Sequence, residues 1–410
     1  MNVTFFPFTP QGSVPAPASK SAAHRMLILA ALADGESTLR INTTGEDIEA
    51  TVRCLRQLGA EITRDGALWT VKPIQNAPQT AVLDCGESGS TLRFLLPVAA
   101  ALGVRATLTG RGRLPERPMG PLLDALRQNG VEVSDGFPIT INGKLKEGAF
   151  TLPGNVSSQF FTGLLLALTR TEGQSVIRVS PPVESESYMR LTLDILQKFG
   201  IEIAENNFTY TIRPKVPQHG VFSAEGDWSG AAALLCLGAA VRGLRLDSAQ
   251  GDRKVLDVLC DFGADIRIEN GIVQAALSNL HGTEINAADI PDLVPVLAAV
   301  AAAASGTTRI TGASRLRLKE SDRIETTCAL LNALGGCAEP TDDGLVIEGK
   351  AQLSGGTVAS FGDHRIVMAA AVLAQTCKQP VTVTDAQAIR KSFPTFFETI
   401  QSLGGVCHVV

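Results

Sequence analysis

A glycine that recurs about every 70 residues constrains the fold of this chain more than any other feature. Each copy follows a run rich in Leu or Phe that has the pattern of a helix end. The six copies are Gly59, Gly130, Gly200, Gly263, Gly335 and Gly404. Because successive copies lie 63 to 72 residues apart, we interpret them as an internal repeat.

The residues after each glycine have the pattern of a β-hairpin. A short alternating strand leads into a tight turn and a second strand, as around Asp65 and Gly66 or around Asn270 and Gly271. Asp-Gly and Asn-Gly steps favour two-residue hairpin turns. With a polar-headed helix and the strands around it, each repeat has the order β-α-β-α-β-β, and six repeats fill the 410 residues. The chain is therefore expected to be an α/β protein.

The last repeat is one strand short. Residues 406–410 supply a single strand after Gly404, whereas residues 3–8 resemble a strand with no helix before it. We predict that this N-terminal strand completes the sixth repeat. With three repeats in each lobe, one lobe would comprise residues 1–18 and 226–410, and the other residues 19–225. The chain would cross between the lobes twice, and a two-strand hinge of this kind suits closure around a substrate.

The helix that follows Ser19 begins with an unusual charge pattern. Lys20 and Arg25 lie in its first turns, although a helix N-terminus disfavours cations unless an anion is also bound. One alternative is a solvated first turn that Ser19 caps. Five more apolar helices start with polar residues, at Ser88, Ser157, Asp227, Asp292 and Asp363. Six such starts predict that these helix ends converge on one ligand.

Three charged segments add to this pattern. Residues 315–319 alternate like the end of a strand, and residues 320–323 resemble the turn into a helix over residues 324–334. The other two segments are the Pro- and Arg-rich loop of residues 111–120 and the cationic stretch of residues 389–394. Each of the three could instead be a solvated surface loop.

Eight cations occupy the predicted helix starts and loops. They are Lys20, Arg25, Arg93, Arg117, Lys319, Arg323, Arg365 and Lys391. In a shared cleft these cations would repel one another, so a small, multiply charged ligand or ligand pair is the expected partner. Arg suits bidentate contacts to phosphate and carboxylate, and Lys acts as a point charge. Asp292 and Glu320 lie among these cations and are candidates for general acid–base catalysis.

Composition and motifs exclude several other classes of protein. The formal net charge of −5 argues against nucleic-acid binding. Residues 1–10 lack a signal-peptide pattern and the most apolar run, residues 293–304, is too short to span a bilayer, so we expect a cytoplasmic protein without a membrane partner. Eight cysteines without metal spacing and five histidines predict reduced thiols and no zinc site. The sequence contains no Walker A loop, nucleophile elbow or dinucleotide fingerprint.

The order and spacing of the charged motifs resemble the 5-enolpyruvylshikimate-3-phosphate synthase family, the 3-phosphoshikimate 1-carboxyvinyltransferases. The motifs are Lys20 and Ser21 with Arg25, and residues 86–93, 116–118, 156–159, 318–323, 362–365 and 391–394. The resemblance implies two similar lobes, each of three βαβαββ repeats in an inside-out α/β barrel, with the active site in the interdomain cleft. It also implies transfer of the enolpyruvyl group of phosphoenolpyruvate to the 5-hydroxyl of shikimate 3-phosphate, without a metal or organic cofactor.

The same resemblance implies the binding residues. Phosphoenolpyruvate would be bound by Lys20, Gly89, Arg117, Gln159, Arg323, Arg365 and Lys391. Shikimate 3-phosphate would be bound by Lys20, Ser21, Arg25, Ser157, Ser158, Gln159, Ser185, Tyr188, Asp292 and Lys319. Asp292 would take the proton of the 5-hydroxyl, and Glu320 and Lys20 would move the proton of the methyl carbon. We expect a monomer whose partners are these two small molecules.

Three positions depart from the family pattern. Residues 86–90 read Gly-Glu-Ser-Gly-Ser where many members have Gly-Asn-Ala-Gly-Thr, which leaves sensitivity to the inhibitor glyphosate open. The side chain of Glu87 is expected to point away from the ligand. Arg315 stands where some members have Asn, and His24 replaces another Asn, so we interpret His24 as structural.

Three alternatives share parts of the pattern. UDP-N-acetylglucosamine enolpyruvyl transferases have the same fold but typically carry a reactive Cys in the Arg-Pro loop, and residues 110–120 contain none. RNA 3′-terminal phosphate cyclases need a nucleophilic His, for which His364 and His24 are the helix-start candidates. A non-catalytic anion-binding protein would not need both Asp292 and Glu320.

Overall fold

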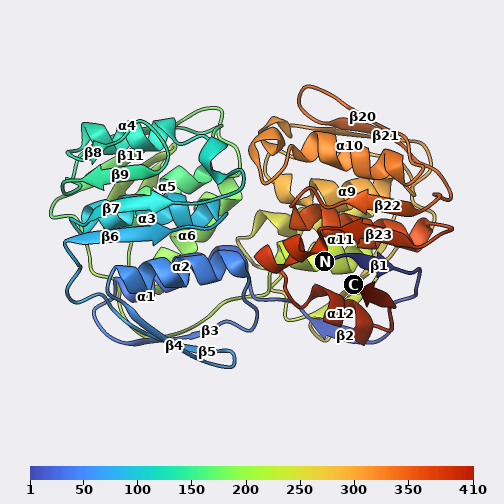
Figure 1. Ribbon diagram of the computed structural model, residues 1–410, viewed down its shortest axis with the longest axis horizontal. Coiled ribbons are helices and arrows are strands. Elements are labelled where there is room, and N and C mark those ends of the chain that lie inside the picture. Colours follow the sequence, from blue (N-terminus) through green and yellow to red (C-terminus); the bar gives the residue numbers. More distant parts are fainter. The chain divides into compact units, whose positions relative to one another are not determined.

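The computed structural model describes all 410 residues, and the chain divides into two compact units. The terminal unit comprises Met1–Ser19 and Glu225–Val410, and the inserted unit comprises Lys20–Ala224. Each unit contains three four-stranded sheets with helices between them (Figure 1). No helix is long and apolar enough to span a membrane.

The inserted unit holds three sheets and six α-helices. The first sheet has the strand order β14 (Val221–Ser223), β3 (Ser37–Arg40), β5 (Leu68–Lys72) and β4 (Glu61–Asp65). The second has the order β6 (Thr80–Asp84), β7 (Arg105–Thr109), β9 (Ile139–Asn142) and β8 (Glu132–Val133). The third has the order β10 (Ala149–Pro153), β11 (Ser175–Ser180), β13 (Thr209–Ile212) and β12 (Ile203–Asn206). Its helices are α1 (Lys20–Ala31), α2 (Glu46–Gln57), α3 (Gly89–Ala101), α4 (Gly120–Gln128), α5 (Ser158–Leu168) and α6 (Glu186–Lys198), with a 3₁₀ turn at Leu114–Glu116.

The terminal unit repeats this organisation. The first sheet has the strand order β2 (Ser13–Pro15), β15 (Ala240–Arg242), β17 (Ile272–Ala276) and β16 (Asp265–Glu269). The second has the order β18 (Glu284–Asn286), β19 (Thr307–Thr311), β21 (Leu345–Glu348) and β20 (Ala338–Pro340). The third has the order β22 (Gly356–Ala359), β23 (Val381–Thr384), β1 (Val3–Phe5) and β24 (Cys407–Val409). Its α-helices are α7 (Trp228–Cys236), α8 (Val255–Asp261), α9 (Val294–Ala301), α10 (Arg323–Ala333), α11 (His364–Leu373) and α12 (Phe396–Ser402). Its 3₁₀ helices are η2 (Gly251–Lys254), η3 (Pro291–Leu293), η4 (Ser314–Leu318), η5 (Ala374–Thr376) and η6 (Ala386–Lys391).

All six sheets have one topology, which confirms the six predicted repeats. In each sheet the first two strands are parallel and the remaining pairs are antiparallel. The six recurring glycines each follow the last residue of an outer helix by two positions and have φ between 76° and 105°. Glycine adopts this left-handed conformation without a steric penalty, so it ends the helix and turns the chain into the hairpin.

The sixth sheet is completed by the N-terminus, as predicted. β1 lies between β23 and β24 and is antiparallel to both, with Val3 opposite Val383 and Val409. The predicted strand over residues 3–8 is shorter in the structure and ends at Phe5. Val3 and Phe5 are buried, so this sheet depends on the first residues of the chain.

At the points where the chain passes from one unit to the other, the last strand before each crossing pairs within the unit that the chain is leaving. β2 immediately precedes α1 in the chain, yet it pairs with β15 of the terminal unit. β14 immediately precedes α7, yet it pairs with β3 of the inserted unit. The two connecting segments bond to each other, because Ser19 N donates to Glu225 O at 2.8 Å and Asp227 N donates to Pro17 O at 2.8 Å.

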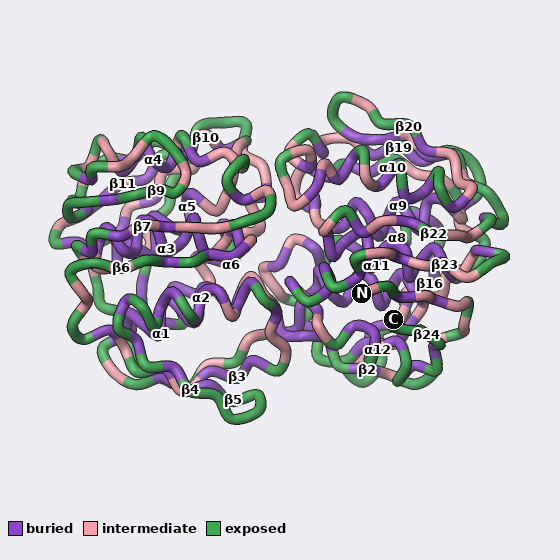
Figure 2. Tube along the Cα trace, in the orientation of Figure 1, coloured by how far each residue is buried: buried purple, intermediate pink, exposed green.

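The inner helices of each repeat are buried along nearly their whole length (Figure 2). All eight residues of α9 are buried, and α9 packs against α7 and α11. In the inserted unit α3 packs against α5, and α1 contacts α5. These helices consist mainly of Ala, Leu, Val and other apolar residues, and their charged side chains lie within the first two turns, toward the N-terminal end.

Two local predictions were wrong. Residues 315–319 do not form a strand end, because Ser314–Leu318 is the 3₁₀ helix η4. The alternation of Arg and Leu arises because Leu316 is buried while Arg317 bonds to Asp322 and Glu325. In addition, the helix expected at Asp292 begins as the 3₁₀ turn η3, and α9 starts at Val294.

Candidate active site

The inserted unit places Lys20 and Arg25 on α1, as the sequence indicated. Lys20 Nζ donates to Asp47 Oδ2 at 2.9 Å. The Arg25 side chain is buried, and its guanidinium donates to Ser21 O at 2.6 Å and to hydroxyl and carbonyl groups on α5 and α6. Burial lowers the pKa of Arg25 to about 9 while Tyr188 opposes the shift, so Arg25 stays cationic at neutral pH.

A second group of predicted residues meets at the start of α3. A Cβ atom on Gly89 would lie 2.9 Å from Arg117 Nη1, so a larger residue there would displace this guanidinium from the helix end. Arg93 donates to Gln159 Oε1 at 2.8 Å, and Gln159 Nε2 donates to Ser90 Oγ at 2.9 Å. The starts of α3 and α5 therefore lie together around Arg117 and Gln159.

The predicted hydroxyl residues lie around these two groups. Ser157 caps α5 by accepting a hydrogen bond from Gln159 N at 3.3 Å, and Ser158 is the first residue of that helix. Ser185 precedes α6 in a left-handed conformation, with φ of 54°. Tyr188 O accepts from Arg25 Nη2 at 3.2 Å, which joins the start of α6 to α1.

In the terminal unit, Arg323 is the centre of a buried charge cluster. Its Nη1 donates to Asp292 Oδ1 at 2.6 Å, and its Nη2 donates to Glu320 Oε2 at 2.8 Å. Its Nε donates to Asp363 Oδ2 at 2.7 Å. Burial alone would lower the pKa of Arg323, but the carboxylates of Asp363, Glu320 and Asp292 raise it well above its ordinary value. One cation thus joins both predicted proton-transfer carboxylates.

The other predicted cations of the terminal unit lie near this cluster. Lys319 Nζ is 3.5 Å from Asp292 Oδ1, and Arg365 Nη2 is 3.9 Å from Asp292 Oδ2. Arg365 Nη1 donates to the backbone oxygen of Ser229 at 2.9 Å. Lys391 Nζ donates to Gly362 O at 2.6 Å, beside the start of α11. Each of these side chains therefore lies at a helix start or in the loop before one.

The structure gives the contacts of the three residues that depart from the family pattern. His24 is buried, its Nδ1 lies 2.8 Å from Thr51 Oγ1, and burial with the nearby cations lowers its pKa well below 6.5. Arg315 Nη2 donates to Ala288 O at 3.0 Å. The Glu87 carboxylate lies against Gly112 in the Arg-Pro loop, where an added Cβ would be 2.7 Å from Oε2.

Sequence reasoning missed two carboxylates of these clusters and the partner of a third. Asp47 on α2 is the direct partner of Lys20. Asp363, which the sequence indicated as a polar helix start, is a direct partner of Arg323. Asp252 in η2 is buried, and desolvation together with the nearby Asp292 raises its pKa to about 7. A single acidic residue in a polar loop carries no sequence signal of burial.

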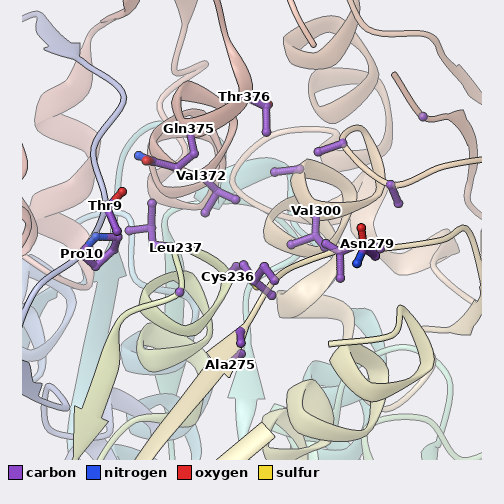
Figure 3. Close-up of a pocket in the computed structure, with 18 of the residues that line it drawn as sticks. Thr9, Pro10, Cys236, Leu237, Ala275, Asn279, Val300, Val372, Gln375 and Thr376 are labelled. Atoms are coloured by element: carbon purple, nitrogen blue, oxygen red, sulfur yellow. The ribbon is translucent and has the colours of Figure 1, made fainter. Parts of the chain in front are cut away.

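A cavity of about 1090 Å³ lies at the other end of the inner helices of the terminal unit. Its lining includes Leu237 after α7, Val300 on α9 and Val372 on α11, together with Gln375 and Thr376 (Figure 3). The lining contains no charged side chain. Because the predicted ligands are anions, this cavity does not match them, whereas the cationic helix starts do.

Known proteins are similar to this chain over nearly its whole length. Residues 9–400 match the family model for EPSP synthase (3-phosphoshikimate 1-carboxyvinyltransferase). The chain is 38% identical to the 3-phosphoshikimate 1-carboxyvinyltransferase of Clostridium novyi, over 99% of this chain and 98% of the relative. It is 40% identical to the enzyme of that name from Clostridium kluyveri, over 98% and 97%. A solved EPSP synthase structure from Acinetobacter baumannii matches with a TM-score of 0.82 and 27% identity, over 100% of this chain and 99% of that one.

Proposed function

The chain belongs to the EPSP synthase (3-phosphoshikimate 1-carboxyvinyltransferase) family, and from that premise we propose which of its residues carry the reaction. The enzyme transfers the enolpyruvyl group of phosphoenolpyruvate to the 5-hydroxyl of shikimate 3-phosphate, and it releases phosphate. This transfer is a step of the shikimate pathway, which leads to chorismate and the aromatic amino acids.

The observation that carries the proposal is the Arg323 cluster. Two carboxylates of the same cluster, Asp292 and Glu320, accept hydrogen bonds from one guanidinium, at 2.6 and 2.8 Å. Asp292 takes the proton of the 5-hydroxyl, and Glu320 with Lys20 moves the proton of the methyl carbon. The Arg323 cation beside Asp292 favours a negative charge on that carboxylate, which suits the acceptor of the 5-hydroxyl proton.

The reaction proceeds by addition and then elimination. In the addition step the 5-hydroxyl oxygen bonds to C2 of phosphoenolpyruvate, C3 takes a proton from the pair Glu320 and Lys20 and becomes a methyl group, and the 5-hydroxyl proton passes to Asp292. In the elimination step the C2–O bond to phosphate breaks and the methyl carbon returns a proton to the same pair, which restores the double bond. Asp292 then gives up its proton to the departing phosphate or to solvent, so each group ends as it began. Positioned proton transfer of this kind contributes about 10² to 10⁴ in rate.

The cations bind the two anionic substrates and stabilise the phosphate that leaves. We assign Lys20, Gly89, Arg117, Gln159, Arg323, Arg365 and Lys391 to phosphoenolpyruvate. We assign Lys20, Ser21, Arg25, Ser157, Ser158, Gln159, Ser185, Tyr188, Asp292 and Lys319 to shikimate 3-phosphate. The hydrogen bonds that hold Arg25 to Thr192 and Thr162 support electrostatic preorganisation, because its guanidinium is already oriented before a ligand binds.

This assignment uses residues of both units for one substrate pair, so it requires that the units close on the ligands. The interdomain active site and the lobe boundaries remain proposals that rest on the family and on the two connecting segments. The monomeric state, the cytoplasmic location and the absence of a nucleic-acid partner also remain predictions.

One assay tests the proposed reaction. Phosphate release from phosphoenolpyruvate should require shikimate 3-phosphate and should be unaffected by metal chelators. UDP-N-acetylglucosamine in place of shikimate 3-phosphate should give no release. Lys20→Ala should raise the KM for both substrates; unchanged kinetics in that variant would contradict the assignment.

A further inference from the structure

Two buried threonines bond to Arg25 and to each other. Thr162 lies on α5 and Thr192 lies on α6, and both residues are buried. Arg25 Nε donates to Thr192 Oγ1 at 2.9 Å, and Arg25 Nη2 donates to Thr162 Oγ1 at 3.2 Å. The two hydroxyl oxygens are 2.8 Å apart. The pair therefore links one guanidinium on α1 to two neighbouring helices.

The acceptors in this group fix the direction of each hydroxyl. Thr192 Oγ1 lies 2.8 Å from the backbone oxygen of Tyr188, which can only accept, so the Thr192 hydroxyl donates its proton to that oxygen. The bond between the two hydroxyls must then be donated by Thr162. Both hydroxyl protons thus point away from Arg25, and both hydroxyl oxygens present lone pairs to its guanidinium.

This arrangement leaves Arg25 one N–H group for a ligand. A guanidinium has five N–H donors, one on Nε and two on each terminal nitrogen. Nε donates to Thr192, and Nη2 donates to Thr162 and to Tyr188 O. Nη1 uses one of its N–H groups on Ser21 O. The remaining N–H is on Nη1, and its direction is fixed because the other bonds fix the plane of the guanidinium.

We propose that Thr162 and Thr192 are positioning residues that orient Arg25 so that the remaining Nη1 N–H donates to shikimate 3-phosphate. The inference rests on the assignment of Arg25 to that substrate in the proposed function. Without the Thr192 hydroxyl, the Nε N–H is left in a buried site without an acceptor, and the guanidinium rotates to find one. The rotation turns the Nη1 N–H away from the substrate, so binding weakens although the charge of Arg25 is unchanged.

The test compares the KM for each substrate in threonine variants, with the other substrate saturating. Thr192→Val keeps the shape and removes the acceptor. It should raise the KM for shikimate 3-phosphate about tenfold, the size expected for one hydrogen bond to a charged group, and change the KM for phosphoenolpyruvate less than about twofold. Thr162→Val leaves the bond to Nε in place, so the same KM should rise only about threefold. Thr192→Ser keeps the hydroxyl and should stay within about twofold of the parent.

Thr169→Val is the matched control. Thr169 is a buried threonine at the far end of α5, and its hydroxyl donates to Leu166 O at 2.8 Å. T169V loses a hydrogen bond of the same kind but none that involves Arg25, so it should leave both KM values unchanged. If T192V does not fold, T162V carries the test, because it removes one acceptor of the guanidinium and keeps the other.

Arg25→Ala separates this inference from the proposed function. If the threonines act through Arg25, the double variant R25A/T192V should have the same KM for shikimate 3-phosphate as R25A. Multiplied effects in the double variant, equal shifts in both KM values, or a T192S variant as impaired as T192V would overturn the inference. If R25A leaves the KM for shikimate 3-phosphate unchanged, the assignment of Arg25 itself is wrong. If R25A raises that KM and neither T192V nor T162V does so, only the role of the threonines is wrong.

Discussion

The two units share one repeat and one kind of helix start, yet they surround their cations with different groups. In the inserted unit the buried Arg25 donates to the hydroxyls of Thr162 and Thr192 and to backbone carbonyls. In the terminal unit the buried Arg323 donates to three carboxylates. The same fold therefore supports two electrostatic environments, and the difference lies in the side chains at the helix starts.

This difference assigns separate tasks to the units. A cation among neutral acceptors keeps its full charge for an anionic ligand, which suits the phosphate of shikimate 3-phosphate. A cation among carboxylates has its charge offset, which suits a cluster that we propose transfers protons. Each unit has exceptions: Lys20 of the inserted unit is paired with Asp47, and in the terminal unit Arg365 donates to Ser229 and Lys391 to Gly362 O.

The largest effect should follow from changing a carboxylate of the terminal unit. Asp292→Asn keeps the shape and removes the proton acceptor, so kcat should fall about 10² to 10⁴-fold while the KM for phosphoenolpyruvate changes little. The exposed Asp342→Asn serves as the control and should leave steady-state kinetics unchanged. A kcat for D292N within threefold of the parent would remove Asp292 from the proton-transfer step.

Replacing the buried arginine of each unit should lower the free energy of unfolding by different amounts. Arg323→Ala leaves three carboxylates without their shared cation and should lower the free energy of unfolding by about 3 to 5 kcal/mol. Arg25→Ala leaves only hydroxyls and carbonyls and should lower it by about 1 to 3 kcal/mol. Urea unfolding followed by circular dichroism measures both values, and equal losses would show that the two environments do not differ as described.

The pH dependence of stability should reveal the buried Asp252. Because its folded-state pKa of about 7 lies above that of an unfolded Asp, the folded protein binds more protons between about pH 4 and 7, and ionisation destabilises it as the pH rises. Asp252→Asn should therefore exceed the parent in unfolding free energy at pH 8, by at most about 4 kcal/mol. The excess should shrink toward pH 5, because Asp252 is then protonated in the folded parent. Asp292, Asp227 and Arg365 remain in both proteins, so their own titration does not produce the difference. A constant difference across this range would contradict the raised pKa.

The smallest expected effect is a change in the radius of gyration. If both units contribute to one substrate pair, shikimate 3-phosphate should lower the radius of gyration by about 1 Å, as expected for domain closure. Small-angle X-ray scattering with and without the ligand measures it, and R25A at the same ligand concentration is the control because it should lose the response. An identical radius with saturating ligand would contradict closure.

The repeat was predictable because it depends on local rules. Gly59 and its five counterparts end helices in a conformation that glycine favours, and Asn270 and Gly271 both have positive φ in the predicted turn. The placement of β1 in the sixth sheet was also predictable, because one repeat lacked a strand. These features follow from composition within a few residues, so a sequence displays them directly.

The remaining features depend on contacts between distant residues. The pairings of β2 and β14 involve strands of three residues, too short for their sequence to specify a partner. The alternation of residues 315–319 imitated a strand because one buried Leu among charged residues fits both a strand and a 3₁₀ helix. The burial of Asp252 and the bond between Asp363 and Arg323 depend on how η2 and α11 pack against the neighbouring helices.

The pairing of β2 and β14 within their own units makes the inserted unit a guest within a host domain. Every strand of its three sheets lies between residues 20 and 224, and every strand of the host lies outside that range. At the point of insertion the host's two ends already touch, with Ser19 N 2.8 Å from Glu225 O. A gene that joins codon 19 directly to codon 225 would thus encode a host with all its own strands, which gives genetic engineering a natural site for replacing the guest.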